Sequence, residues 1–423
     1  MPRGASRYRL PVRVFRRILR PRGIQKKWAG NRPMYMLADC AATIQHVAQF
    51  VHSSFFLRPG TACPLEAPCV AVTRKGRRGE KRNGQLIHIA YPERSAVRAT
   101  SATSTTTCAM SLQIFDVDQL LPDPDLDGFR QNAPDKCLFA GESRCGIWFA
   151  RPGSNGERYG VIGHYGARDG RQSQALLTAA CDLLRDGGCS AVYGPMDGNT
   201  WKSYRFVTWS NGSPPFLMEP RNPPQWPEYW RQSGFAPSHE YISTLVTDLA
   251  SIDPRLVKAR TRLQEAGITW RPVDLGRFED ELKQVYRLSL AAFKKNVLYA
   301  EIDETSFLRQ YLPFAGKIDA GYVLLAHDAA ARCCGFIFAI PDLLQLQQGS
   351  SVDRLVIKTL AVHSHRSTAG LGAVLVDEVQ RTAAKNGFTS AIHALMYAGN
   401  VSANIGKGST LLRRYALFGK TLS

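Results

Sequence analysis

The sequence predicts a mixed α/β fold with two related halves, in which helices flank a mixed sheet. Its hydrophobic fraction of 44% is that of globular proteins with substantial cores. One order of elements (strand, turn, helix, glycine stop, strand) occurs twice, over 159–194 and again over 355–396. Such a repeat indicates duplication of one α/β unit.

The first copy has apolar runs of strand length on either side of a helix with one apolar face. Paired glycines stop that helix, because glycine is favoured just beyond helix ends. The expected elements are a strand at 159–165, a turn at 168–171, a helix around 175–184, a stop at 187–188, and strands at 191–194 and 239–247.

The second copy is more complete. The dipeptide Asp253-Pro254 opens its first helix, since proline suits the first helical position. The expected elements are helix 255–266, strand 268–273, helices 279–293 and 303–312, strands 321–327, 334–340 and 355–362, helix 371–383, and strands 390–396 and 413–418. We therefore divide the chain into an extension (1–109), a first half (110–250) and a second half (251–423).

The formal net charge of +19 is concentrated at one end of the chain. Residues 1–109 contain 20 Lys and Arg against 4 Asp and Glu, whereas the remainder contains 34 against 31. The near-neutral globular part argues against a nucleic-acid surface there. Nucleic-acid binding is thus expected only if residues 1–109 provide it.

Three interpretations of residues 1–109 stay open. The segment is a disordered basic tail that touches nucleic acid or acidic lipid, an Arg-rich targeting segment, or the product of an over-long gene prediction. We favour the third, because the composition changes abruptly at Met110 to that of an ordinary globular domain. An intact-mass measurement on protein from the native source decides among them.

The ten cysteines are scattered, and only Cys333 and Cys334 are adjacent. No C-x-x-C occurs and the nine histidines show no zinc-ligand spacing, so no metal is expected. We expect free thiols in a reducing compartment, and hence a cytoplasmic protein. No apolar run reaches the roughly 20 residues of a membrane helix, so no membrane partner is expected.

A glycine-containing turn follows strand 355–362 and reads Arg366-Ser367-Thr368-Ala369-Gly370-Leu371-Gly372-Ala373. This turn and the element order around it resemble the GNAT acyltransferase superfamily, whose turn reads Gln/Arg-x-x-Gly-x-Gly/Ala. Here Ser367 holds the leading position and the arginine stands one residue earlier. The resemblance implies two tandem GNAT-like domains, of which the first lacks the glycines and is a degenerate copy.

The turn suits an acyl-CoA cosubstrate on physical grounds. A helix N-terminus leaves N–H groups without partners, and glycine lets a phosphate approach the backbone closely. An arginine beside it adds a charged donor. Together with the resemblance, this predicts cofactor contacts by Leu360, Val362, Arg366, Ser367, Gly370, Leu371, Gly372, Ala373 and Asn404.

The resemblance also implies a tyrosine that protonates the departing thiolate, and Tyr415 is the matching residue. A tyrosine hydroxyl has a reference pKa of about 10 and is a proton donor at neutral pH; a packed aromatic is the alternative role. The general base is less well defined. Asp353, just before strand 355–362, is the candidate, and the alternatives are Glu301, Asp303 and Glu304.

A polar and aromatic segment in the first half supplies candidate acceptor-binding residues: Asp197, Trp201, Tyr204 and Arg205. A proline-rich stretch follows at 214–224. Ordered loops of this composition suit either a ligand wall or a purely structural role.

The expected reaction is transfer of an acetyl or other acyl group from acyl-CoA, chiefly acetyl-CoA, to an amine of a small molecule or peptide. Two alternatives remain. One is a FemABX-like aminoacyl transferase that uses aminoacyl-tRNA, and the other is a non-catalytic acyl-CoA-binding module.

Overall fold

The structure is a computed structural model that describes residues 112–153, 156–251, 253–399 and 408–422. The basic extension, with its three interpretations, and Asn404 lie outside the described residues. Among the described helices, none combines the length and apolarity that a membrane crossing requires.

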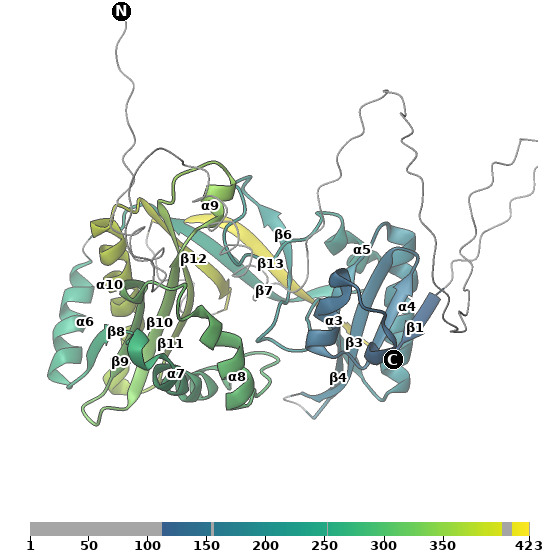
Figure 1. Cartoon of the computed structure of the whole chain (residues 1–423), viewed down its shortest axis with the longest axis horizontal. Coiled ribbons are helices and arrows are strands. Elements are labelled where there is room, and N and C mark those ends of the chain that lie inside the picture. The colour runs from purple at the N-terminus through teal and green to yellow at the C-terminus, as the bar shows by residue number, and fades with distance from the viewer. Residues whose placement is uncertain (1–111, 154–155, 252, 400–407, 423) are drawn as a thin grey trace, which may run out of the picture. The chain divides into compact units, whose positions relative to one another are not determined.

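One sheet of 13 strands joins both halves (Figure 1). Its order is β1-β2-β3-β4-β5-β13-β7-β12-β11-β10-β9-β8, and β6 pairs with β13. The strands are β1 Leu112–Phe115, β2 Lys136–Ala140, β3 Ser143–Pro152, β4 Arg158–Gly166, β5 Ala191–Gly194, β6 Phe206–Ser210, β7 Ala236–Val246, β8 Thr269–Pro272, β9 Val323–His327, β10 Cys333–Pro341, β11 Arg354–Val362, β12 Ser390–Tyr397 and β13 Thr410–Thr421.

Helices cover the sheet in both halves. Those of the first half are α3 Asp127–Asn132, α4 Gly170–Asp186 and α5 Trp226–Gln232. Those of the second half are α6 Pro254–Glu265, α7 Phe278–Phe293, α8 Glu304–Tyr311, α9 Leu344–Gln347 and α10 Leu371–Lys385. The mixed α/β class and the helix-flanked mixed sheet predicted from the sequence are therefore confirmed.

The two halves exchange their last strands. In sequence order β7 ends the first half, yet it pairs antiparallel with β12 of the second half. Strand β13 ends the second half, yet it pairs antiparallel with β5 of the first half. The two exchanged strands lie side by side, antiparallel, at the centre of the strand order (Figure 1). Because of this exchange, neither half completes its sheet without the other.

Strand β11 separates two cores of the second half. Leu355 and Ile357 pack with α6 and α10, whereas Val356 and Ala361 pack with α7 and α8. Residues 355–357 follow the two-residue period of a strand, and one extra residue on β11, Lys358, shifts the period so that Ala361 shares the face of Val356. This packing assigns one face of β11 to the helix that opens at Gly370 and the other face to the α7–α8 pair.

The strands and helices expected in the two copies are all present, with ends that differ by a few residues. Residues 112–152, for which no element was predicted, form β1, α3, β2 and β3. The six cysteines within the described ranges are free thiols: Cys137, Cys145, Cys181, Cys189, Cys333 and Cys334. The domain limits themselves stay a prediction.

Candidate functional site

Strands β11 and β12 part midway along their length. They pair in parallel from Arg354 with Ser390 to Ile357 with His393. Beyond this point β11 continues to Val362 without pairing with β12, while β12 stays paired with β7 along its other edge as far as Tyr397. We call the resulting opening the second-half fork, bounded by residues 358–362 of β11 and 394–397 of β12.

Local irregularities on both strands produce the fork. On β11, Phe338 pairs with Thr359 and the next residue of β10 pairs with Ile357, so Lys358 is an inserted bulge residue. On β12, the register shifts between His393 and Met396, and Leu395 has a positive φ of 59°. Bulges twist and bend a strand, and here they turn the two strands away from each other.

The open end of the fork leads to the glycine turn. Gly370 is the N-cap of α10 with φ +83°, a conformation that favours glycine, and no side chain caps the helix. A Cβ on Gly372 would lie 3.3 Å from Leu360 Cδ2 and 3.6 Å from Val362 Cγ2. The first turn of α10, from Leu371 to Ala373, therefore stands directly against β11. The structure thus brings together the predicted residues 360, 362 and 370–373.

The residues before Gly370 form an ordered turn with positive charge beside it. His365 Nδ1 accepts a hydrogen bond from the Ser367 N–H at 3.2 Å, which caps the short 3-10 helix Arg366–Thr368. Arg366 is exposed, and Arg262 of α6 donates to the Ala369 carbonyl. Two arginines therefore flank the N-terminus of α10, where a phosphate would be stabilised. Arg262 and His365 were not predicted from the sequence.

Lys358 lies where the two strands part. Its Nζ donates to the Met218 carbonyl at 3.3 Å. Burial lowers the pKa of Lys358 to about 7, the positive charge of Arg205 lowers it as well, and Glu219 opposes both. A lysine with such a pKa exchanges a proton near neutral pH, which the sequence prediction of a carboxylate base did not anticipate.

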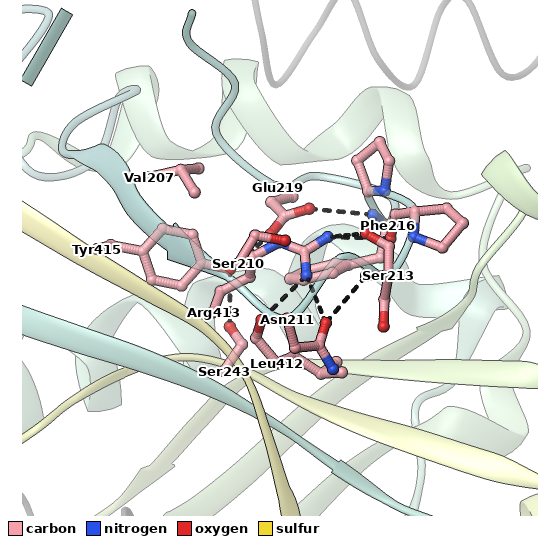
Figure 2. A network of polar contacts seen from close by, with 12 residues as sticks. Val207, Ser210, Asn211, Ser213, Phe216, Glu219, Ser243, Leu412, Arg413 and Tyr415 are labelled. Carbon is pink, nitrogen blue, oxygen red and sulfur yellow. Dashed lines mark hydrogen bonds and ion pairs between the residues drawn. The ribbon is translucent and has the colours of Figure 1, made fainter. Parts of the chain in front are cut away.

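Next to the fork, Glu219, Arg413 and Tyr415 form a buried polar network (Figure 2). Glu219 Oε1 lies 3.0 Å from Arg413 Nε and accepts the Tyr415 hydroxyl at 2.8 Å. Arg413 also donates to the carbonyls of Ser213 and Pro214, so it fastens the proline-rich stretch to β13. This stretch has the structural role that the sequence left open, and it also positions the Met218 carbonyl.

Tyr415 is fully buried and connects this network to the fork. Its hydroxyl lies 3.0 Å from Ser243 Oγ, which accepts the Leu395 N–H at 2.9 Å. Burial raises the pKa of Tyr415 above its ordinary value, and the carboxylate of Glu219 raises it further. The hydroxyl therefore stays protonated at neutral pH, while its role as proton donor to a thiolate stays a prediction.

Asp353 lies at the other end of β11 from the glycine turn. Its carboxylate accepts hydrogen bonds from Gln345 Nε2 at 2.8 Å and Thr389 Oγ1 at 3.2 Å. Seven residues of strand separate it from Leu360, roughly 23 Å at about 3.3 Å per residue. Of the alternative carboxylates, Asp303 caps α8 by accepting the Ser306 N–H at 2.8 Å.

Three of the four predicted acceptor residues contact the second half or β7. Trp201 Nε1 donates to the Ala300 carbonyl at 2.7 Å, and its ring lies edge-on to Phe307 of α8. Tyr204 packs edge-on against Tyr241 of β7, and Arg205 NH1 donates to the Leu395 carbonyl at 3.2 Å.

Asp197 is directed to a different place. Its Oδ1 accepts the His164 N–H of β4 at 2.6 Å, inside the first half. The structure therefore brings Trp201, Tyr204 and Arg205 to the second half or to β7, and places Asp197 against β4.

Part of the chain matches a known protein family. Residues 251–403 match the family described as myristoyl-CoA:protein N-myristoyltransferase, N-terminal domain. This match covers the fork and the glycine turn. The second half is thus similar to a family of acyl-CoA-dependent transferases, in line with the resemblance of its sequence to the GNAT acyltransferases. A search of curated protein sequences gave no match.

Several solved structures resemble this chain at low sequence identity. The glucosamine N-acetyltransferase region of a fungal multi-domain GH3 β-N-acetylglucosaminidase has 11% identity and a TM-score of 0.46, and covers 74% of this chain. This chain spans 38% of that protein's length. A tandem GNAT protein from the clavulanic acid biosynthesis pathway has 14% identity and a TM-score of 0.40, and the match covers 74% of this chain and 99% of that one.

A further similar structure is a probable N-acyltransferase of unknown function from Enterococcus faecalis. It has 10% identity and a TM-score of 0.44, and the match covers 74% of this chain and 73% of that one.

Proposed function

We propose that this protein transfers an acyl group from acyl-CoA to an amine, and that the second-half fork is the site. One observation carries the proposal. The fork extends from the uncapped N-terminus of α10, with Gly370 at φ +83°, to Lys358 at the point where the strands part. The five residues from Lys358 to Val362 span roughly 13 Å of strand, four steps of about 3.3 Å, which suits an extended thioester arm.

The residues of the turn fit the phosphates of coenzyme A. Gly370 takes a positive φ of 83°, and Gly372 lets the first turn of α10 pack closely against β11, since a Cβ there would approach Leu360 to 3.3 Å. The N–H groups that open α10 and the guanidinium groups of Arg262 and Arg366 would hold the negative charge.

The chemistry that we propose needs one base and one acid. The acceptor amine attacks the thioester carbonyl carbon, the C–S bond breaks, and the sulfur leaves as a thiolate. Lys358, neutral above about pH 7, takes a proton from the amine. Tyr415 is the proposed donor to the thiolate through the Ser243 hydroxyl, 3.0 Å away, for which its O–H turns from Glu219 to Ser243 and the Ser243 proton passes to the sulfur. Positioning of the two substrates supplies the remaining acceleration.

The acyl donor is the finer part of the proposal. Acetyl-CoA remains the first choice, and the matched family's name makes a long-chain donor such as myristoyl-CoA the second. The acceptor is a small-molecule or peptide amine. No cluster of three or more His, Cys, Asp or Glu side chains suited to a metal occurs within the described ranges. The free thiols of the described cysteines favour a cytoplasmic location.

Isothermal titration of the full chain with acetyl-CoA and with myristoyl-CoA tests the proposal. We expect micromolar binding of at least one of them, followed by release of free thiol when an amine acceptor is added. Tight binding without thiol release over a broad amine panel would indicate a non-catalytic acyl-CoA-binding module. Absence of binding by the folded protein would overturn the cofactor assignment and favour the aminoacyl-tRNA alternative.

A further inference from the structure

Arg205 is a buried arginine at the second-half fork. Its side chain lies between the rings of Tyr204 and Tyr241, with Cζ 3.8 Å and 3.9 Å from their centroids. Only 7% of the residue is exposed, and its backbone has a positive φ of 75°. A non-glycine residue in this conformation is held there by its surroundings. The guanidinium is therefore fixed in place and largely removed from water.

The hydrogen bonds of Arg205 are incomplete within the described part of the chain. NH1 donates to the Leu395 carbonyl at 3.2 Å, whereas the buried Nε–H has no acceptor among the described residues. No described carboxylate lies within ion-pair distance of Arg205. The two rings and one hydrogen bond stabilise the guanidinium, but among the residues that the structure describes they leave its charge without a counter-ion and the buried Nε–H without an acceptor. Both are costly, so such a group points to a ligand that completes it.

The nearby carboxylates are engaged elsewhere. Glu219 pairs with Arg413 at 3.0 Å and accepts the Tyr415 hydroxyl at 2.8 Å. Asp197 accepts the His164 N–H at 2.6 Å. Lys358 adds a second cationic group at the fork, with the Met218 carbonyl as its hydrogen-bond partner. Arg205 and Lys358 therefore give the fork more positive charge than the nearby carboxylates offset.

We propose that Arg205 binds a carboxylate of the acceptor, so that the acceptor is an amine that also carries a carboxylate, as an amino acid or a small peptide does. This inference rests on the proposed acyl transfer and names its acceptor class. Arg205 contacts β12 and Lys358 belongs to β11, so the two groups lie on opposite sides of the same fork. A carboxylate at Arg205 directs the amine of the same molecule toward Lys358.

The electrostatics of Lys358 agree with this arrangement. Burial first and the charge of Arg205 second lower the pKa of Lys358. A carboxylate bound at Arg205 offsets that repulsion and makes Lys358 a stronger base while the acceptor is present. In the free protein Lys358 is present in both protonation states at neutral pH, and the bound acceptor increases its affinity for a proton.

Matched acceptors test the carboxylate. Thiol release from acetyl-CoA, or from the donor that the titration identifies, is measured for the free amino acids and for the corresponding amino acid amides. We expect the free acids to react about tenfold faster or more, the size of a charge-assisted hydrogen bond. Arg205→Gln should remove this preference by slowing only the acids. Arg287→Gln, at an exposed position of α7, is the control that should keep it.

A binding readout separates this inference from the acyl transfer itself. In protein labelled with ¹⁵N-arginine, the signal absent from Arg205→Lys identifies the Nε–H of Arg205. We expect free amino acids to shift this signal saturably and the amides to leave it unchanged. Melting temperatures of the variants confirm that they fold.

The outcomes are distinct. Equal rates for acids and amides would overturn the carboxylate and leave the acyl transfer standing. If no amine reacts but free amino acids still shift the Arg205 signal, the acyl transfer fails and the anion site stands. If the acids produce neither turnover nor a shift, the assignment of Arg205 is wrong.

Discussion

The two halves of the molecule contain the same strand pair, yet only one pair opens into a fork. In the first half, β4 and β5 pair in parallel only from Tyr159 with Ala191 to Val161 with Tyr193. The following chain then fills the space beside β4. The Met196 N–H donates to the Ile162 carbonyl at 2.8 Å, and the next N–H of that edge, at His164, donates to Asp197 at 2.6 Å. The first half thus occupies with its own backbone the space that the second half leaves between its strands.

The helices that follow β4 and β11 also differ, in how their N-termini are capped. The N-terminus of α4 is capped by Asp169, whose carboxylate accepts the Gln172 N–H at 2.8 Å. The N-terminus of α10 has Gly370 at the same position and no side-chain cap. A carboxylate satisfies the helix donors and repels phosphates, whereas a glycine leaves the donors accessible. If the two halves arose by duplication, as the sequence predicts, the strand–helix–strand unit was kept in both, while the strands part only in the second half and the following chain fills that space in the first.

The largest expected effect concerns the first turn of each helix. Gly372→Trp should abolish measurable acyl-CoA binding, because a side chain there would fill the space beside Leu360 and Val362. Arg171→Trp, at the matching exposed position of α4, should leave the Kd unchanged. Isothermal titration measures both, and melting temperatures control for folding. Weakening by the α4 variant would mean that the first half also binds the cosubstrate.

The next effect concerns the proposed base. Lys358→Met should lower kcat by about 100-fold, within the range of general-base contributions. For the wild type, kcat/KM, which reports the free protein, should rise with pH through about 7 and then level off, because only neutral Lys358 accepts a proton. The variant should lack this rise. A wild-type rate that is flat from pH 6 to 8, or an unchanged inflection in Lys358→Met, would assign the base to another group.

A third prediction tests how tightly the first half is closed. A Cβ at Gly163 would lie 2.1 Å from the Met196 carbonyl oxygen, so Gly163→Ala should lower the free energy of unfolding by about 2–3 kcal/mol. Gly166→Ala on the same strand is the control, since its Cβ would meet neighbours only at 3.8 Å and beyond. Urea denaturation compares the two. An unchanged stability of Gly163→Ala would show that the segment after β5 moves easily and that β4 and β5 of the first half can part.

The sequence predicted the positions of the helices and strands better than it predicted which strands pair. Periodicity and the glycines located β11, α10 and the turn between them. The exchange of β7 and β13 could not be predicted, because the alternation of apolar residues along a strand does not depend on which strand pairs with it. Local patterns define a strand and its faces, and long-range packing selects its neighbours.

The site residues divide in the same way. Gly370 and Gly372 follow from a local motif that the structure places against β11. Glu219 could not be predicted, since its partners Arg413 and Tyr415 lie 194 and 196 residues away and no local pattern links them. Lys358 did carry a signal, as the only charge within residues 355–362, but the family pattern predicts a carboxylate as the base.

The smallest predicted effect separates stability from binding at the two helix N-termini. Asp169→Ala removes the carboxylate that caps α4, and loss of an N-cap costs about 1 kcal/mol. Asp169→Asn keeps an acceptor oxygen and should cost less. Neither change should alter the Kd for acyl-CoA, because Met196 and Asp197 still fill the space beside β4. Denaturant unfolding and titration measure the two quantities on the same samples. If Asp169→Ala instead created a second acyl-CoA site, the carboxylate of Asp169 would be what keeps the first half from binding acyl-CoA, and not the chain segment that fills the space beside β4.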